Sequence, residues 1–541
     1  MCQDGSVMGC ADRGCMSAEA CWKDDEVAGQ NRWSISRAAV VITALTAIST
    51  LLGFVRDVVI ASVFGAGPEL DAFLVAQGLM TLLLGLIATA VAKSVTPTVA
   101  REVAEERTDP GRCVGHRSFD TALTVTLVVL GVSAMLLGLL AGPVTSVIAP
   151  GFSDDQAQLT AGLTRVMLVA TVLIAGTNLI AALVQAHGRF VWSALEGVPF
   201  NLAMITAAAL FGPDHGVKAL AVGFVVGSAL RLLMQLPPVR RLRIGLRARL
   251  DLRDQGFQEI ARLVPAMLVG TAIVNVNTMV DRAVGSTVGD GAITALSFGW
   301  RLIHLPETLI ITALLVPLYP ALGAAVRDQD ELRRLVGRGL DVSLTVLTPV
   351  AIVLAVTAVP LVTLVFGRGA FDGHAVMLTA TALAWYAPGL VALGCRAIVV
   401  KASYSIGDQR APMVVAVVAM VVNVVGDIVL APIMGVAGIA LATTASLVLA
   451  AVVNLMLLHR RHQAVDIRAV GGLVSRTAAL ALVSGTAGVL LAAWTQGMAP
   501  AAAILLTAGV VSVVFYGGVI LLRGPERAVL SDVWRIARRR R

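Results

Sequence analysis

Charged residues are scarce in this sequence. Lysine, arginine, aspartate and glutamate make up 14% of its 541 residues, whereas hydrophobic residues make up 57%. An ordinary soluble domain carries about 25% charged residues. The mean hydropathy of +0.84 shows that apolar residues are too many for one soluble core and too widespread for a single anchor. The composition excludes a water-soluble fold and indicates a polytopic membrane protein.

The sequence also lacks the common motifs of catalysis. It has no Gly-x-x-x-x-Gly-Lys-Ser/Thr loop, which excludes a nucleotide-hydrolysing engine in this chain, and no Gly-x-Ser-x-Gly turn. His304 and Glu307 have a metal-ligand spacing, but Pro306 lies between them and no third ligand is near in sequence. No repeated pore loop suggests a channel. We therefore expect no enzyme, no metal site and no cofactor.

Aromatic residues, at 5%, are too few to interleave with the basic residues as nucleic-acid binding requires. The formal net charge is nevertheless +8. In a membrane protein, an excess of lysine and arginine more often records the topology. We expect no nucleic-acid partner.

The six cysteines do not form a clear metal motif. Cys2, Cys10, Cys15 and Cys21 lie near the N-terminus, Cys113 lies in a charged loop and Cys395 in an apolar run. The first four lack Cys-x-x-Cys pairs, and their segment is short and polar. We predict a disordered cytoplasmic tail over residues 1–37, with a zinc cluster as the alternative. This tail has no apolar signal-peptide region, and Met8 and Met16 are alternative translation starts.

Apolar runs between charged breaks predict about fourteen transmembrane helices, each long enough to cross a bilayer of about 30 Å. The predicted spans lie near 38–63, 70–98, 119–149, 159–186, 191–211, 217–238, 259–285, 291–323, 339–366, 376–400, 412–432, 436–458, 471–494 and 500–522. The second, third and eighth are longer than necessary, so we expect tilts or kinks there.

Arginines collect in every second loop, as the positive-inside rule requires of cytoplasmic loops. Arg101, Arg107, Arg112 and Arg117 follow span two, Arg189 follows span four, and Arg240, Arg241, Arg243, Arg247, Arg249 and Arg253 follow span six; Arg327, Arg333, Arg334 and Arg338 follow span eight, Arg410 follows span ten, Arg460, Arg461 and Arg468 follow span twelve, and Arg538 to Arg541 end the chain. The other loops hold little besides Lys218 and Arg368. This alternation predicts an even number of spans, with both termini in the cytoplasm.

Two internal repeats are visible. SVFGAGPELDAFLVAQGL at 62–79 aligns with STVGDGAITALSFGWRLI at 286–303, and HGVKALAVGFVVGSALRLL from His215 aligns with MGVAGIALATTASLVLAAV from Met434. The copies lie six spans apart, so they have the same orientation, as in carriers built from two parallel halves. We predict a tail at 1–37, an N-terminal six-helix lobe at 38–238, a basic cytoplasmic linker at 239–258, a C-terminal six-helix lobe at 259–458, two additional helices at 459–522 and a basic cytoplasmic tail at 523–541.

Charged residues inside the spans are candidates for function, because each costs at least about 2.5 kcal/mol at the bilayer centre unless it is paired or hydrated. The spans contain Arg56, Asp57, Lys93, Asp281, Arg282, Arg301, Glu307 and Asp427. Arg56 and Arg301 lie well inside their spans, which favours function. Asp281 and Arg282 could equally pair locally or reach an interface. Arginines facing a cavity would attract an anion, and their planar fork suits a diphosphate.

Four segments resemble the MurJ/MviN family, which belongs to the superfamily of multidrug, oligosaccharidyl-lipid and polysaccharide exporters. They are GFVRDVVIASVFGAGPELDAFLVA at 53–76, LVPAMLVGTAIVNVNTMVDRAVGS at 263–286, WRLIHLP at 300–306 and YSIGDQRAPMVVAVVAMVVNVVGDIVL at 404–430. The resemblance covers residues 36 to 523. It implies a flippase that moves lipid II, the undecaprenyl-diphosphate-linked peptidoglycan precursor, to the outer leaflet of the bacterial plasma membrane by alternating access. Lipid II, the bilayer and peptidoglycan-synthesis proteins are the implied partners.

The resemblance also implies a substrate site of cavity arginines. Carried over to this chain, the site residues are Arg56, Asp57, Asp71, Arg282 and Arg301, with Lys93 as a replacement cation. The chain departs from the family where Ser-Arg is Ser49-Thr50, where paired arginines are replaced by Leu83, Leu84 and Gly85, and where Tyr-Ala-Asp-Arg is Phe298-Gly299-Trp300-Arg301.

Those departures leave alternatives open. The chain could carry another polyprenyl-diphosphate glycan or, less in keeping with its residues, a drug. It could also be a non-transporting scaffold of cell-wall synthesis. The retained Arg56 and Arg301 favour transport, and the missing nucleotide motif favours coupling to the membrane potential or an ion gradient.

Overall fold

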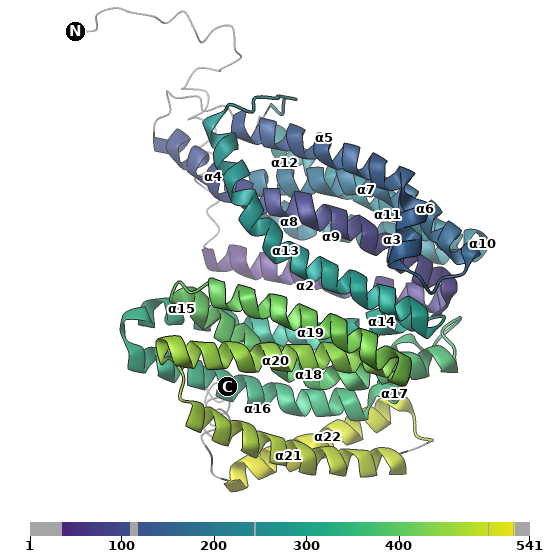
Figure 1. Ribbon diagram of the computed structural model, residues 1–541, viewed down its shortest axis with the longest axis vertical. Helices are drawn as coiled ribbons and strands as arrows, with labels where there is room; N and C mark the ends of the chain where they lie inside the picture. Colours follow the sequence, from purple (N-terminus) through teal and green to yellow (C-terminus); the bar gives the residue numbers. More distant parts are fainter. Residues whose placement is uncertain (1–34, 109–116, 243–244, 496, 523, 525–541) are drawn as a thin grey trace, which may run out of the picture.

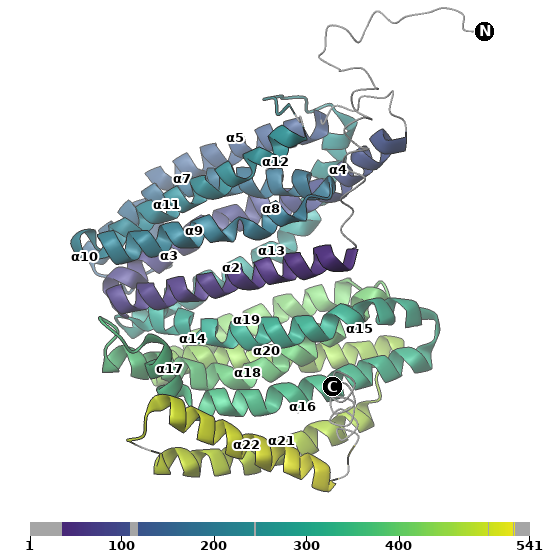
Figure 2. The same ribbon diagram turned by 180° about the vertical axis from the view of Figure 1, so that it is seen from behind.

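The structure is a computed structural model that describes residues 35–108, 117–242, 245–495, 497–522 and 524. The cysteines of the predicted N-terminal tail, Cys113 and nearly all of the predicted C-terminal tail lie outside these residues. Within them the chain is helical, in two stacked bundles with a further helix pair at one edge (Figure 1, Figure 2).

The first bundle, the N-lobe, is drawn in purple to blue in Figure 1. Its elements are α2 (Ile35–Phe64), α3 (Pro68–Leu84), the π-helix η2 (Gly85–Thr89), α4 (Ala90–Thr108), α5 (Arg117–Leu139), α6 (Ala141–Ile148), α7 (Asp154–Ala186), α8 (Phe190–Leu195), α9 (Gly197–Thr206), the π-helix η3 (Ala207–Phe211), α10 (Gly212–His215), α11 (Val217–Met234) and α12 (Leu236–Arg241).

The second bundle, the C-lobe, is drawn in green. Its elements are α14 (Ala292–Pro306), the π-helix η4 (Glu307–Ile311), α15 (Thr312–Ala324), the 3₁₀-helix η5 (Ala325–Arg327), α16 (Gln329–Val356), α17 (Ala358–Phe366), α18 (Gly373–Ser405), α19 (Arg410–Met434) and α20 (Val436–His462). The pair α21 (Ile467–Trp494) and α22 (Pro500–Leu522) packs against α16 and α17 at the edge away from the N-lobe.

One long helix, α13 (Gln255–Val288), connects the bundles. It packs against α3 and α4 of the N-lobe and against α19 and α20 of the C-lobe, and it crosses obliquely between them in Figure 1. Its N-terminal end is tied to the N-lobe, where the Ser118 hydroxyl donates to Asp254 at 2.7 Å and the backbone amide of Arg247 donates to Asp120 at 3.3 Å. The basic linker is therefore fastened to the N-lobe.

Thirteen helices among the described residues are long and apolar enough to cross a membrane. They coincide with thirteen of the fourteen predicted spans. The remaining prediction, 259–285, falls on α13, which is a continuous helix of 34 residues but is not one of the thirteen. The chain is an all-helical multi-pass membrane protein.

Two predicted spans, 119–149 and 339–366, are each broken into a long and a short helix. α5 ends at Leu139 and α16 ends at Val356, and a proline follows four residues later in both cases, at Pro143 and Pro360. A proline has no N–H for the carbonyl four residues earlier, and its ring collides with that carbonyl in a continuous helix. A proline favours a break at this point without requiring one, since Pro265, Pro349 and Pro388 lie inside the continuous helices α13, α16 and α18. The kink expected in 119–149 is present, and the break in 339–366 was not predicted.

These breaks occupy equivalent places in the two lobes, as parallel repeats require. The second aligned repeat agrees, because its glycines Gly216 and Gly435 begin α11 and α20 with φ values of +58° and +60°. Spans two and eight also share a feature: each contains a π-helical turn, η2 or η4. The internal repeat is thus visible in the backbone.

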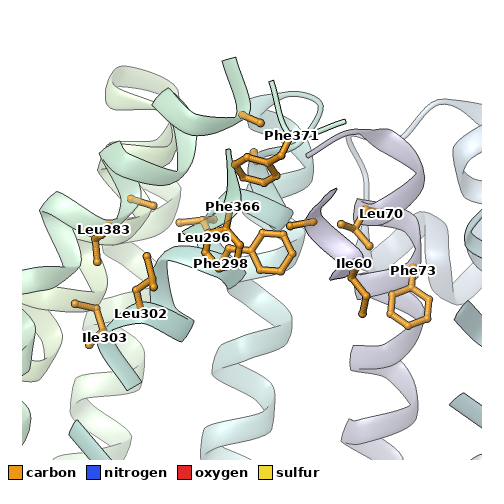
Figure 3. Packing of buried hydrophobic residues seen from close by; sticks show 14 of the residues in the cluster. Ile60, Leu70, Phe73, Leu296, Phe298, Leu302, Ile303, Phe366, Phe371 and Leu383 are labelled. Carbon is orange, nitrogen blue, oxygen red and sulfur yellow. The ribbon is translucent and has the colours of Figure 1, made fainter. Parts of the chain in front are cut away.

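The lobes meet at one end of the molecule. The arginine-rich loops lie at the end that we call the basic end, and α10 and α17 lie at the opposite end, on the right in Figure 1. At this opposite end Ile60, Leu70 and Phe73 of the N-lobe join one buried cluster with Phe298 and Phe366 of the C-lobe (Figure 3). The interlobe core therefore lies away from the basic end.

Candidate functional site

A cavity of about 770 Å³ lies between the lobes. Residues of α2 and α3, with Met204 of α9, form its N-lobe wall, and residues of α13, α14 and α18 to α20 form the rest. The lining extends to Tyr404 and Pro412 at the basic end of the C-lobe. A volume of this size can hold the headgroup of a ligand of several hundred daltons.

Two arginines from different lobes share one carboxylate in this cavity. Arg56 of α2 donates to Asp57 through Nη2 and Nε, at 2.7 and 3.0 Å from Oδ1. Arg301 of α14 donates through Nε to the other oxygen, Oδ2. The Asp57 side chain is only 9% exposed, whereas that of Arg301 is 40% exposed. One negative charge thus faces two cations, and the group carries a net positive charge toward the cavity.

Two neutral residues orient Arg56. Its Nη1 donates to the Asn201 side-chain oxygen at 3.1 Å, and the Asn201 amide nitrogen donates to the backbone carbonyl of Ser49 at 3.2 Å. The guanidinium also lies 5.8 Å from the ring centroid of Phe200. A search for charged residues misses Asn201 and Phe200, because both are ordinary residues of a predicted span.

Arg282 lines the same cavity but has an interlobe partner. Its Nη1 donates to the backbone carbonyl oxygen of Leu74 on α3. Asp281, the preceding residue, accepts a hydrogen bond from the Asn423 amide at 3.0 Å, and the same amide donates to Asp427 at 2.7 Å. This polar group lies on the C-lobe wall, where carboxylate and amide oxygens are the ligand types of hard cations. Among the described residues, however, no three His, Cys, Asp or Glu gather as a metal site requires.

Asp71 is not among the residues that line the cavity. It is 1% exposed and lies in the first turn of α3. Its carboxylate accepts hydrogen bonds from the backbone amides of Gly291 and Thr294, both at 2.7 Å, and from the Thr294 hydroxyl at 2.6 Å. Asp71 therefore joins the N-lobe to the N-terminus of α14, where the helix dipole favours a negative charge.

Lys93 also lies outside the cavity lining, on an exposed part of α4. Thr50, at a departure from the family pattern, is exposed and donates to the backbone carbonyl of Thr46 at 2.9 Å. His304 does line the cavity, and its Nδ1 lies 2.6 Å from Glu307. Neither Lys93 nor Thr50 lines the cavity.

Some charges inside the spans were overlooked in the sequence. Arg396 of α18 lines the cavity, and Glu196 forms an ion pair with Arg231 at 2.7 Å inside the N-lobe, outside the cavity lining. The signal that identified Arg56 and Arg301, a charge within an apolar run, applies equally to these three residues.

Several contacts close the end opposite the basic loops. The backbone amide of Ala370 donates to the carbonyl of Ser62 at 2.8 Å, and that of Gly151 donates to the Ser286 hydroxyl at 3.2 Å. Phe366 stacks on Phe298 at a centroid distance of 4.9 Å, within the cluster in Figure 3. With Asp71 and Arg282, these contacts separate the cavity from the opposite end.

Known proteins resemble the chain over most of its length. A family model described as "Lipid II flippase MurJ" matches residues 38–508. The lipid II flippase MurJ of Burkholderia cenocepacia is 31% identical over 420 residues, which cover 75% of this chain and 80% of that protein. A probable lipid II flippase MurJ of Vibrio cholerae is 27% identical over 439 residues, covering 78% and 82% of the two chains.

The fold is also found among solved structures. A lipid II flippase MurJ in an inward closed conformation superposes with a TM-score of 0.74, at 18% identity, covering 89% of this chain and all of that one. An inward-facing transporter of the multidrug resistance MATE family superposes with a TM-score of 0.62, at 16% identity, over 79% of this chain and 98% of that one. The fold is therefore shared with both families, and the two relatives described above are lipid II flippases or probable lipid II flippases. The chain belongs to the MurJ family of lipid II flippases.

Proposed function

We propose that this protein moves lipid II from the inner to the outer leaflet of the bacterial cytoplasmic membrane by alternating access. The observation that carries the proposal is the cavity between the lobes, in which Arg56 and Arg301 share the single carboxylate of Asp57. Membership of the MurJ family supports lipid II as the substrate over another polyprenyl-diphosphate glycan. The retained cavity arginines support transport over a scaffold role. No bond of the substrate is made or broken.

The proposal places the basic end and both termini in the cytoplasm. Cytoplasmic loops collect arginine, and every second loop of this chain does so. The cavity lining extends toward this end, while Asp71, Ser62 and their partners close the other one. In this orientation, the conformation described here is the one that receives a lipid headgroup from the cytoplasmic leaflet.

The arginine pair is suited to a diphosphate. Asp57 holds the two guanidinium groups in place while the cavity is empty, because each donates to a different oxygen of one carboxylate. A diphosphate carries more than one negative charge and accepts paired hydrogen bonds from planar guanidinium groups. It can therefore compete with Asp57 for Arg301, the more exposed member of the pair. A ligand held between α2 and α14 contacts both lobes at once.

Movement of the lobes against each other completes the cycle. We propose that residues 38–238 and 259–458 move as two units. The linker is fastened to the N-lobe through Ser118 and Asp120, so the bending occurs beyond Asp254, in α13. Opening of the outer side requires the loss of the interlobe hydrogen bonds of Asp71 and Arg282.

Leaflet-specific labelling of lipid II tests the function in cells depleted of their own flippase. Expression of this chain should restore outer-leaflet lipid II. Arg301→Ala should reduce flipping by roughly tenfold or more at equal membrane levels, since a hydrogen bond from a charged donor contributes about 1.5–3 kcal/mol. Arg301→Lys should restore only part of it, because the charge remains and the planar fork is lost.

Arg165→Ala is the matched control. Arg165 is an exposed arginine of α7 that donates to the Gly138 carbonyl at 3.1 Å and does not line the cavity. It should leave flipping unchanged. Failure of the unmodified chain to restore outer-leaflet lipid II, in a protein that reaches the membrane, would refute the proposal.

A further inference from the structure

The packing of α13 side chains against α3 depends on a glycine. A Cβ atom placed on Gly78 would lie 1.8 Å from Nη1 of Arg282 and 2.1 Å from Cε of Met279. The guanidinium therefore occupies the space that a side chain at position 78 would fill. In this position it reaches the carbonyl oxygen of Leu74, one helical turn before Gly78. The absence of a side chain at Gly78 thus leaves the space that the guanidinium of Arg282 occupies.

The hydrogen bond from Arg282 to Leu74 joins the two lobes. Leu74 belongs to α3 of the N-lobe, and the part of α13 around Arg282 is held to the C-lobe by the bond between Asp281 and Asn423 of α19. Asp71 lies three residues before Leu74 and makes its own interlobe contacts. We call the end opposite the basic loops the outer end, and the interlobe contacts that close it the seal. The Arg282 contact is therefore part of the seal.

This contact differs from the other hydrogen bonds of the seal because it faces the cavity. Arg282 and Leu74 both line the cavity, whereas Asp71 does not. A ligand in the cavity can reach the guanidinium without first opening the seal. The hydrogen-bond acceptor of the guanidinium is the neutral carbonyl oxygen of Leu74, and the charge of the neighbouring Asp281 also attracts it. A diphosphate is a stronger acceptor, because both partners are then charged and two parallel bonds can form.

We propose that Arg282 couples occupancy of the cavity to opening of the outer end, an inference that rests on the proposed function. In the empty state the guanidinium holds α3 and α13 together through Leu74. An anionic headgroup in the cavity accepts hydrogen bonds from the Arg282 guanidinium in place of the Leu74 carbonyl. The seal then loses the hydrogen bond between Arg282 and Leu74. A ligand without the anionic group leaves the bond intact and does not favour opening.

The test uses Gly78→Ala, which fills the space of the Arg282 guanidinium and leaves every charge in place. The groups that must move are the ends of two flexible side chains, so the helix itself is preserved. Spin labels at Glu69→Cys and His374→Cys report the distance between the lobes, since both positions are exposed at the outer end, on α3 and α18. The protein is the full chain in nanodiscs, with its native cysteines replaced by alanine and its flipping shown to be retained.

Two control variants isolate Arg282. Gly131→Ala is another glycine-to-alanine change within a helix, at a position where an added Cβ meets nothing within 4 Å. It should leave the distance distribution unchanged. Met279→Ala removes the other side chain that Gly78→Ala displaces, and it should also leave the distribution unchanged. If Met279→Ala reproduces the effect of Gly78→Ala, methionine packing holds the seal and the proposal is overturned.

Without ligand, Gly78→Ala should raise the ratio of long to short distances by roughly tenfold or more. Undecaprenyl diphosphate should raise this ratio in the parent chain, and undecaprenol, which lacks the diphosphate, should not. Equal distributions for Gly78→Ala and the parent would overturn the role of Arg282. A Gly78→Ala effect with no response of the parent to undecaprenyl diphosphate would overturn the coupling. Failure of the proposed function is distinct, because it appears as absent lipid II flipping whatever the distances show.

Discussion

Substitution of Asp71 tests whether the outer seal limits the transport cycle. The carboxylate accepts three hydrogen bonds at 2.6–2.7 Å from Gly291 and Thr294, across the lobe interface. Asp71→Asn keeps one side-chain oxygen and loses the charge, so at least one of these bonds is lost. A hydrogen bond to a charged group contributes about 1.5–3 kcal/mol. The stability of the closed state relative to the open state should therefore fall by about 1.5–3 kcal/mol. This corresponds to a change of roughly 10- to 150-fold in the ratio of the open to the closed population.

The assay is labelling of a buried cysteine from the outside of intact cells. Leu296→Cys is suitable because Leu296 lines the cavity and is only 6% exposed. A membrane-impermeant maleimide should reach it only when the outer end opens. The parent chain without Leu296→Cys measures the background from the native cysteines. Asp71→Asn should increase the labelling rate within the range above and slow lipid II flipping, because closure of the outer end becomes unfavourable.

Glu69→Gln is the matched control for this prediction. Glu69 is a carboxylate of the same first turn of α3, but it is exposed. Its substitution should leave the labelling rate unchanged. Labelling of Asp71→Asn at the parent rate would refute the assignment of Asp71 to the seal. An equal increase for Glu69→Gln would show that charge at the helix end, and not the interlobe bonds, matters.

Three further predictions concern other parts of the chain. Although partial burial raises the pKa of Asp408, hydrogen bonds from the Ala411 amide and His462 and the charge of Arg461 together hold it below its usual value. The resulting stabilisation is present above a pH of about 4, the pKa of Asp408 in the unfolded chain, and it is lost as the pH falls through the lowered pKa of the folded protein. Asp408→Asn should therefore lower the melting temperature at pH 7. It should make no difference at a pH below the folded and the unfolded pKa of Asp408. A cysteine at Asp214 should react with an impermeant thiol reagent in intact cells and one at Arg247 should resist it, and reaction at both positions would contradict the topology. Gly435→Ala should cost about 1–3 kcal/mol of stability, because φ is +60° and ψ is −134° there, whereas Gly131→Ala should not; equal melting temperatures for the two variants would show that the backbone relaxes without strain.

The membrane spans and the repeat could be predicted from sequence because the bilayer acts on each segment separately. Every backbone polar group in lipid must be satisfied within its own helix, so an apolar run of sufficient length forms a spanning helix wherever it packs. Pro143 and Pro360 favour the breaks that precede them, but the sequence could not single these prolines out, because Pro265, Pro349 and Pro388 lie inside continuous helices. Gly216 and Gly435, aligned by sequence, also have matching backbone conformations.

The partners of Arg301 and Asp71 were decided by tertiary structure, whereas Arg56 pairs with its sequence neighbour Asp57. Arg301 meets Asp57 across 244 residues, and Asp71 meets Thr294 across 223. Hydropathy specifies that a segment crosses the membrane, but its rotation and tilt depend on packing against neighbouring helices. The pattern of charges identified Arg56 and Arg301, and the family resemblance added Asp71. Neither separated the residues of the cavity from those of the seal.

The case of Arg282 shows the same limit most clearly. The sequence placed a cation late in a predicted span, next to Asp281. Its acceptor is the backbone oxygen of Leu74, reached through the space left by Gly78. Neither a leucine carbonyl nor a glycine carries a signal of charge or periodicity, because every residue has a carbonyl and a glycine has no side chain. What determines the contact is how closely two helices approach, and only the packing of the lobes sets that distance.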